Sequence, residues 1–499
     1  MEKDVLHYGM ISILPAIVAL GLAIWSKRVI ESLIVGIFSG AMIIDANANG
    51  IGHAILYGIT NLFNAIAGHP ANSDLGLRGM GLIRNQGRAD TILVVLLLGA
   101  FITILDKSGG AFAFGEWVSS KVKTKKGAQN ATALMGCSLF TSAYFSSLAT
   151  GTVFRPIYDK MKISREKLGF ILDSTSAPIN TLIPISGWVA YMGALIVDNI
   201  PEVTDPMRGL IATIPFNFYC IVILVVVFLV ANDKIKDFGP MKKAEERVQK
   251  QVKIENKVQQ EMAATSEIRN GTVSDMVWPL GVSVFILVIL GLWNYTIANF
   301  FDVGRVPLNG NKMLIISFML GIIVAFIKYT SSKLMTAKEF LDEVIEGTKS
   351  AIIGGMIIIL AVTLGDMLRA QAPEGLGAAQ YLGDVAGSII PKGIVPFAVF
   401  LLSSFMGFSM GTSWGVWGIM MPIAVPLTLA TGGNPYIAAA AVLSGGTFGD
   451  HCSPISDTTI MSSIGAGCEH MDHVNTQLPY ALLAAGIASV CFLIAGFIL

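Results

Sequence analysis

Long apolar stretches separated by short polar segments constrain this chain more than any other feature of its sequence. A helix needs roughly 20 apolar residues to cross the hydrocarbon core of a bilayer. Stretches that approach this length cover residues 9–26, 28–47, 91–106, 209–231, 276–298, 312–329, 345–366 and 476–499. Because every backbone group must be paired inside lipid, we expect an all-α polytopic membrane protein.

The composition agrees with a membrane protein and excludes several other classes. Charged residues make up 14% of the chain, against about 25% in soluble proteins, and hydrophobic residues make up 53%. The 34 Lys and Arg residues balance the 34 Asp and Glu residues. A nucleic-acid partner is not expected, because nucleic-acid binding requires a basic excess. The 5 cysteines are scattered and show no disulfide framework.

A polar segment at residues 232–275 divides the apolar sequence in two. We therefore expect a first transmembrane repeat at 1–231, a charged linker at 232–275 and a second transmembrane repeat at 276–499. Short segments rich in Lys and Arg remain on the cytoplasmic side of a membrane. This rule predicts insertion in the cell inner membrane, with the linker in the cytoplasm.

The two halves share a pattern of residues that indicates an internal duplication. Asp106 and Asp366 each end an apolar span, and about 45 residues later come Gly151-Thr152 and Gly411-Thr412. Both pairs are offset by 260 residues (366 minus 106, 411 minus 151). A Ser- and Pro-containing block follows in each half, around Pro178 and Pro454. Three matches in the same order favour a true repeat.

Each repeat is expected to hold about five spans and a re-entrant helical hairpin. In the first repeat the hairpin covers 131–155, with residues 150–152 at its tip, and the next span is broken at 176–181. The corresponding break in the second repeat lies at 453–458. An odd number of crossings per copy makes the two repeats inverted in topology. Inverted repeats with helices broken at mid-membrane are typical of secondary transporters.

Broken helices inside a membrane leave carbonyl groups that can bind a hard cation such as Na⁺, together with hydroxyls and carboxylates. We therefore predict sodium at the two breaks. The expected cation or substrate site comprises Thr150, Gly151, Thr152, Asp173, Ser176, Asn180, Thr181, Gly411, Thr412, Ser413, Asp450, Ser453, Ser456, Asp457 and Thr458.

The carboxylates at this depth are costly, since each adds about 2.5–3.5 kcal/mol on insertion scales. They are accounted for if Asp173, Asp450 and Asp457 bind either a cation or a proton, which makes Na⁺ and H⁺ competitors. Alternatively they are structural, each a buried Asp that caps a half-helix. Asp106 and Asp366 lie at span ends, and either role stays open for them.

Two further residues have alternative interpretations. Arg155 could hold a substrate carboxylate, but an arginine there more often extends to the interface or pairs with an acid such as Asp159. His451 could carry a proton or be a hydrogen-bonded structural residue.

The motifs at 449–459 (GDHCSPISDTT), 151–157 (GTVFRPI) and 164–178 resemble the NhaC-type Na⁺/H⁺ antiporter family. The family is usually grouped with the ion-transporter superfamily. The resemblance implies inverted repeats, paired hairpins and a homodimer that moves by an elevator mechanism. It also places the Gly-Thr segments in the hairpins. Some members of the family exchange malate for lactate, and some resemble amino-acid carriers.

We therefore expect a sodium-coupled secondary active transporter in the lipid bilayer, most simply a Na⁺/H⁺ antiporter. The alternative is a Na⁺-coupled carrier of a small amino acid or carboxylic acid that uses the same cation site. A membrane enzyme or a channel is the least favoured class. No cofactor is expected besides Na⁺ as the coupling ion.

Overall fold

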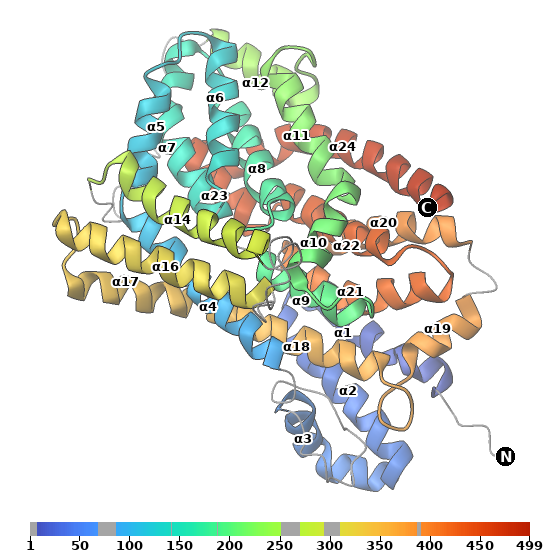
Figure 1. The fold of residues 1–499 in the computed structure, drawn as a ribbon. Coiled ribbons are helices and arrows are strands. Elements are labelled where there is room, and N and C mark those ends of the chain that lie inside the picture. Colours follow the sequence, from blue (N-terminus) through green and yellow to red (C-terminus); the bar gives the residue numbers. More distant parts are fainter. Residues whose placement is uncertain are drawn as a thin grey trace.

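The computed structural model is built of helices throughout the residues that it describes (Figure 1). These are residues 7–67, 86–140, 142–186, 188–250, 270–293, 310–386 and 391–499. Within them, nine helices are long and apolar enough to cross a membrane, or ten if one bent pair forms a span. The prediction of an all-α polytopic membrane protein is confirmed.

Eleven α-helices and two short 3₁₀ helices lie in the described residues of the first half. They are η1 (Gly9–Ile13), α1 (Leu14–Ser26), α2 (Val29–Asn49), α3 (Ile51–Ala67), α4 (Gln86–Lys107), α5 (Gly110–Ser119), α6 (Lys125–Ser138), α7 (Ala143–Met161), α8 (Arg165–Leu182), α9 (Val189–Asn199), α10 (Pro206–Thr213), η2 (Ile214–Phe216) and α11 (Phe218–Ala231). The expected single span at 209–231 is in fact the pair α10–α11, bent by 57°. Pro215 lies at the bend and removes a backbone donor there.

The second half follows a helix in the linker. Its elements are α12 (Gly239–Lys250), α14 (Val273–Leu292), α16 (Gly310–Ser331), α17 (Ala337–Ser350), α18 (Ile352–Arg369), α19 (Ala378–Ala386), η4 (Lys392–Ile394), α20 (Val395–Met410), α21 (Ser413–Ala430), α22 (Pro435–Cys452), α23 (Asp457–Ala466) and α24 (His470–Ile498). The expected span at 345–366 covers the junction of α17 and α18, and part of 276–298 lies outside the described residues.

The starts of several helices are encoded locally by capping residues. Thr272 and Asp275 form a capping box at the start of α14, and Thr336 and Glu339 form one at the start of α17. In a capping box, side chains bond to backbone N–H groups that the first turn of the helix leaves unpaired. Local side-chain bonds therefore help to define where these two helices begin.

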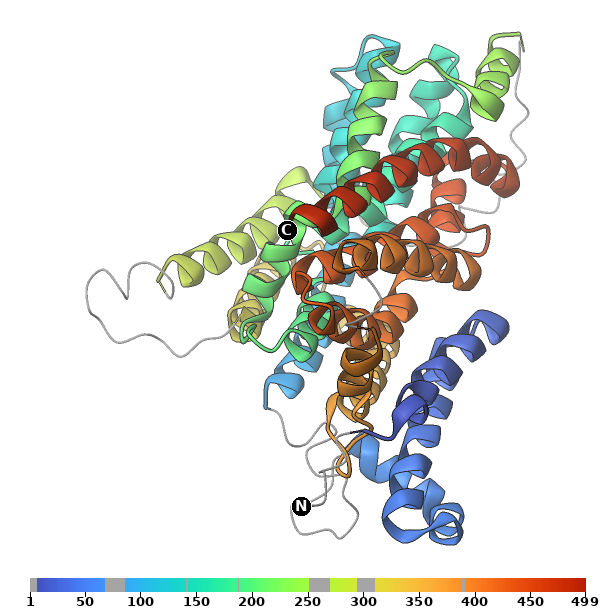
Figure 2. The ribbon, with the colours of Figure 1, turned by 90° about the vertical axis from the view of Figure 1, so that its right-hand side faces the viewer.

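The helices pack at close range through small residues, as is common in membrane proteins. Helices α20 and α22 illustrate this: a Cβ atom on Gly449 would lie 2.4 Å from the backbone nitrogen of Phe408. Helix α4 packs against α16 and α17, which lie beside it in Figure 1. Figure 2 shows α1 and α2 at one edge of the molecule, where α2 contacts α18.

The linker helix α12 lies against the ends of two other helices. Glu166, near the start of α8, pairs with Arg247, and the buried Lys167 pairs with Asp237 at 2.5 Å. Arg247 also lies 3.6 Å from Asp472 of α24. The described part of the linker includes the helix α12, which ion pairs connect to α8 and α24.

Candidate functional site

Two helical hairpins and two broken helices converge on one region of the molecule. Helices α6 and α7 form the first hairpin, and α20 and α21 form the second. Helix α8 is separated from α9 by residues 183–188, and α22 is separated from α23 by residues 453–456. Helix α7 packs against α23, so the first hairpin meets the second broken helix.

The tip of the first hairpin lies earlier in the chain than the sequence pattern predicted. Helix α6 ends at Ser138 and α7 begins at Ala143, whereas Gly151 and Thr152 lie inside α7. In the second hairpin, Gly411 does end α20, with a left-handed φ of 64° that glycine adopts without strain. The match of Gly151 to Gly411 therefore does not identify equivalent positions.

Gly151 has a packing role. A Cβ atom there would lie 2.4 Å from the backbone of Gly465, so α7 and α23 cross at this point. Thr150 is buried beside it, while Thr152 is exposed and bonds to the carbonyl of Leu148 in its own helix. The triplet at 150–152 is thus a helix-crossing motif rather than a hairpin tip that gathers ligands.

The first helix break also differs from the prediction. Residues 176–181 are helical, and α8 continues past Pro178 to Leu182. The chain leaves the helix at Ile183, whose φ and ψ of −90° and 118° are extended, directly before Pro184. Ser453, directly before Pro454, is extended in the same way. A residue that precedes proline is driven toward extended geometry, which accounts for both breaks.

When the two helix breaks are aligned at their prolines, the residues around them match with a single offset. Pro184 matches Pro454, and Asn180 matches Asp450, both with an offset of 270 residues (454 minus 184, 450 minus 180). Thus the first repeat has an amide where the second has a carboxylate. Asn180 is buried, and neither polar atom of its side chain has a hydrogen-bond partner among the described residues.

Asp450 connects the second hairpin to the second helix break. It is 3% exposed, at the end of α22. One carboxylate oxygen accepts hydrogen bonds from the backbone N–H of Ser413, at 3.0 Å, and from the Ser413 hydroxyl. The other accepts one from the Ser456 hydroxyl at 2.7 Å. All three donors are neutral.

The other hydroxyls of the two breaks bond nearby protein groups. The Thr458 hydroxyl lies 3.0 Å from that of Ser456, and Ser453 donates to the carbonyl of Phe408 at 2.7 Å. In α8, Ser176 donates to the carbonyl of Asp173 within its own helix. Thr181 lies 3.3 Å from the hydroxyl of Thr447, across the contact of α8 with α22.

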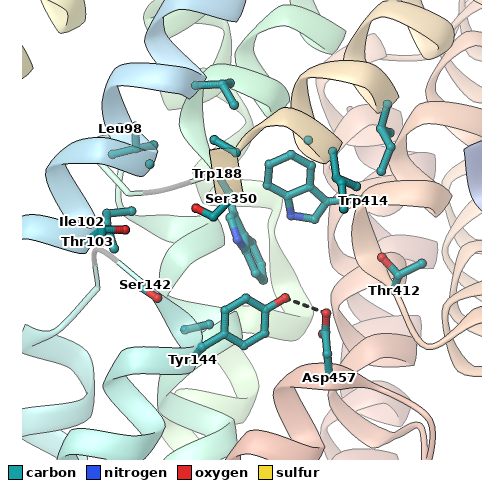
Figure 3. A pocket seen from close by; sticks show the side chains of 17 residues that line it. Leu98, Ile102, Thr103, Ser142, Tyr144, Trp188, Ser350, Thr412, Trp414 and Asp457 are labelled. Atoms are coloured by element: carbon teal, nitrogen blue, oxygen red, sulfur yellow. Dashed lines mark hydrogen bonds between the residues drawn. The ribbon is translucent and has the colours of Figure 1, made fainter. Parts of the chain in front are cut away.

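Asp457 faces a different space from Asp450, although both flank the same break. It accepts a hydrogen bond of 2.6 Å from the Tyr144 hydroxyl at the tip of the first hairpin. The side chains of Asp457 and Tyr144 line a cavity of about 420 Å³ (Figure 3). Trp188, from the first break, and Trp414, from the second hairpin, line the same cavity.

Asp173 lies deeper, in the middle of α8, and is fully buried. One carboxylate oxygen accepts a hydrogen bond from Gln477 of α24 at 2.8 Å. The other has no hydrogen-bond partner among the described residues. Gln477 is in turn bonded to His473 at 2.8 Å. No basic side chain in the described part of the chain forms an ion pair with Asp173 or Asp450.

Both ring nitrogens of His451 are hydrogen-bonded inside the protein. One lies 2.6 Å from the Tyr219 hydroxyl and the other lies 3.0 Å from the Ser174 hydroxyl. The side chain is fully buried. This arrangement favours the structural interpretation of His451 over a mobile proton carrier.

Arg155 binds carbonyl groups at the end of a helix. Its Nη2 atom donates to the carbonyls of Ile464 and Gly465, at 2.7 and 2.6 Å, near the C-terminus of α23. Cationic side chains are stabilised at helix C-termini. Asp159, the acid that the sequence suggested as a partner, accepts two hydrogen bonds from Arg165.

The two span-end carboxylates are not part of the cavity wall. Asp366 pairs with Arg369 at 2.8 Å, one turn later in α18. Asp106 is partly buried at the end of α4.

Sequence reasoning missed Tyr144, Trp188, Trp414 and Gln477. Gln477 could have been found as a lone amide near the start of the last apolar span. The aromatic residues carried no such signal, because aromatic side chains are common in membrane helices. Only the folded chain shows that they surround one cavity.

Comparison with known proteins agrees with this architecture. The profile of the Na⁺/H⁺ antiporter family matches residues 1–208 and 191–497. An uncharacterized protein of Haemophilus influenzae is 32% identical over 97% of this chain and 91% of its own length. The Na⁺/H⁺ antiporter NhaC of Alkalihalophilus pseudofirmus is 36% identical over 19% of this chain and 20% of its own.

Among solved structures, MtrF of Neisseria gonorrhoeae superposes with a TM-score of 0.55 at 14% identity, covering 91% of this chain and 86% of MtrF. At this identity the likeness concerns the fold alone. The family profile, by contrast, covers nearly the whole chain. The chain is therefore a multi-pass secondary transporter, not an enzyme, and belongs to the Na⁺/H⁺ antiporter family.

Proposed function

We propose that this protein exchanges Na⁺ for protons, with Asp450 and Asp173 as the groups that bind them. The observation that carries the proposal is the surroundings of Asp450. Its carboxylate is buried and receives only neutral donors, from Ser413 and Ser456. A buried carboxylate without a cationic partner is unstable in its charged form. It therefore holds either a proton or a metal cation.

The oxygen atoms around Asp450 suit Na⁺. Hard cations prefer carboxylate, hydroxyl and carbonyl oxygens. The Ser456 hydroxyl bonds to the carboxylate, and the Thr458 hydroxyl lies 3.0 Å from that of Ser456. The break at 453–456 also frees backbone carbonyls from helical hydrogen bonding. Binding of Na⁺ here would hold the second hairpin against the second break, and replacement by a proton would release it.

Asp173 provides a second buried carboxylate in the first repeat. One of its oxygens already accepts a hydrogen bond from Gln477, which leaves the other for a proton or a cation. We propose that the two carboxylates act in the same exchange cycle.

The test is Na⁺-driven proton movement in proteoliposomes loaded with a pH-sensitive dye. A pulse of external Na⁺ is expected to raise the internal pH, since Na⁺ enters as protons leave. Asp450→Asn and Asp173→Asn are each expected to reduce the initial rate at least tenfold. Glu346→Gln is the matched control, because Glu346 forms only an exposed pair with Lys349. Normal exchange by both Asn variants would refute the assignment, and a silent wild type would refute Na⁺/H⁺ exchange itself.

A second candidate function is Na⁺-coupled transport of a small organic solute. A dehydrated Na⁺ ion needs no space beyond its oxygen ligands, whereas pockets for organic ligands typically measure about 300–1,000 Å³. The cavity beside Asp457 measures about 420 Å³. Uptake that requires both Na⁺ and an added solute would distinguish this function from simple exchange.

The membrane location, the side of the linker and the oligomeric state complete the proposal. We place the chain in the inner membrane as a homodimer, with the linker in the cytoplasm. Helix α12 carries Lys242, Lys243 and Arg247, which agrees with a cytoplasmic position. Labelling of a cysteine introduced in α12 from one side of intact cells tests the orientation, and crosslinking in membranes tests the dimer.

A further inference from the structure

We propose that the cavity beside Asp457 binds the ammonium group of a small organic solute. The inference rests on the second candidate function proposed above, and it names the chemical class of the solute. It is carried by the charge of the cavity, by the aromatic rings that line it and by its position next to the Asp450 cluster.

The cavity has one charged residue in its wall. Of the 17 described residues that line it, Asp457 is the only acid, and no Lys, Arg or His is among them. The Asp457 side chain is exposed to this space, and its hydrogen-bond partner is the neutral Tyr144 hydroxyl. A solute with only carboxylate groups would meet a negative charge that no cationic side chain of the cavity wall offsets. An ammonium group would instead be attracted to it.

Aromatic rings surround the same space. Figure 3 shows Tyr144, Trp188 and Trp414 facing the cavity around Asp457. The face of an indole ring attracts a cation, with Trp the strongest of the aromatic residues in this respect. One carboxylate together with three aromatic side chains therefore forms a site suited to an ammonium ion rather than to a neutral or anionic head group.

The two tryptophans are held in place by their neighbours. Trp414 stacks on Tyr191 with ring centroids 4.8 Å apart, and the Tyr191 hydroxyl donates to the carbonyl of Trp414 at 2.8 Å. Trp188 packs edge-on against Trp417, with centroids 5.4 Å apart. Rings that are already fixed lose little conformational entropy when a ligand binds.

Apolar side chains of α4 and α18 also line the cavity and would contact the carbon skeleton. They are Leu98, Ile102, Ile353 and Ile357. A solute of four or five carbon atoms with one ammonium group suits this lining. Its ammonium group would lie near Asp457 and the aromatic rings, and its carbon chain would contact the apolar side chains. The cavity volume of about 420 Å³ accommodates such a molecule with some water.

The position of the cavity links it to the proposed Na⁺ site. Thr412 lines the cavity, and its neighbour Ser413 donates to Asp450. Asp457 lines the cavity, and its neighbour Ser456 also donates to Asp450. The segments 412–413 and 456–457 thus each have one residue in the cavity wall and an adjacent residue bonded to the Asp450 carboxylate. A solute in the cavity and a cation at Asp450 would therefore both affect the positions of these two segments.

The experiment uses the full-length protein purified in detergent at neutral pH, with melting temperature as the readout. The probes are n-butylammonium chloride and tetramethylammonium chloride, with n-butanol and potassium butyrate as uncharged and anionic counterparts. The ammonium compounds are expected to raise the melting temperature saturably, and the counterparts are not. An equal response to n-butanol or butyrate, or no response to either ammonium compound, overturns the proposal.

Variants locate the binding. Asp457→Asn is expected to weaken the apparent affinity for n-butylammonium at least tenfold, and Trp414→Leu is expected to weaken it severalfold with the charge intact. Asp384→Asn, an exposed acid of α19 outside the cavity, is the matched control and should bind as the wild type does. If Asp457→Asn does not fold, Trp414→Leu and Trp188→Leu decide the result. Unchanged affinity in every folded cavity variant overturns the proposed site.

The dye assay in proteoliposomes separates this inference from the proposed function. Na⁺/H⁺ exchange without ammonium binding refutes the inference and leaves the exchange proposal standing. Saturable ammonium binding without any Na⁺-driven flux refutes Na⁺ coupling and leaves the inference standing.

Discussion

The Tyr144 hydroxyl donates a hydrogen bond of 2.6 Å to Asp457, which joins the tip of the first hairpin to the break of the second repeat. The two residues lie 313 positions apart in the chain. Through this bond, one residue from each repeat forms the charged end of the cavity. The geometry of this end of the cavity therefore depends on how the two repeats are placed relative to each other.

Tyr144→Phe removes this hydrogen bond and keeps the aromatic ring. A hydrogen bond to a charged group contributes about 1.5–3 kcal/mol, and less where both side chains are exposed, as they are here. The melting temperature in detergent is expected to fall by a few degrees, while Na⁺-driven exchange continues at a reduced rate. Tyr57→Phe is the control, because Tyr57 contacts His53 through its ring, which the substitution retains. Equal melting temperatures for both variants would contradict a stabilising role for the contact.

Gly151→Ala should destabilise the protein at the crossing of α7 and α23. The added Cβ atom would lie 2.4 Å from the backbone of Gly465, which cannot move as a flexible side chain would. Overpacking of this kind costs about 1–3 kcal/mol. Gly486→Ala provides a matched control in α24, since nothing lies within 4 Å of its added atom. Thermal unfolding should show a clear loss for Gly151→Ala and none for Gly486→Ala.

Asn180→Leu tests whether the amide equivalent to Asp450 serves a ligand. Its polar atoms have no hydrogen-bond partner in the described part of the chain, so an apolar residue of similar volume should cost little stability without Na⁺. Any stabilisation by added Na⁺ is expected to shrink. The comparison is Asn217→Leu, which leaves the buried Ser444 hydroxyl without its partner at 2.5 Å and should lower the melting temperature. A large loss of stability in Asn180→Leu would indicate a structural role instead.

Asp237→Asn tests how α12 is held on the membrane helices. Lys167 has a side chain only 5% exposed and pairs with Asp237 at 2.5 Å, so loss of this negative charge leaves the buried cation with the more distant Glu245, 4.0 Å away. The expected cost is roughly 1.5–3 kcal/mol. Trypsin cleavage after Lys243 or Arg247 in α12 should become faster. Glu246→Gln, which affects only an exposed pair with Lys242, should leave the cleavage rate unchanged.

Much of the fold could be predicted from the sequence because the relevant signals are local. A bilayer requires long apolar helices, so hydropathy located spans such as α1, α2, α16 and α24. The carboxylate at Asp450 and the break at Pro454 were also found, because a charge or a proline inside an apolar span is costly and therefore stands out. These features follow from the solvent and the backbone alone.

Tertiary structure decided the rest. Pro178 and Pro184 both lie near the end of α8, and either could end a helix by local chemistry. Packing of α8 against α7, α11 and α22 keeps Pro178 helical, and the break occurs at Pro184. Gly151 resembled a turn residue, yet its role is to allow the close approach of α23, which comes from the other repeat.

The sequence by itself determined that this chain is a polytopic helical membrane protein, since its long apolar stretches must pair their backbone groups within each helix inside lipid. Only the folded chain decided which residues meet. Tyr144, Trp188, Trp414 and Asp457 come from four separate segments, and no local pattern connects them. Their convergence depends on the packing of one repeat against the other, which is a property of long-range contacts.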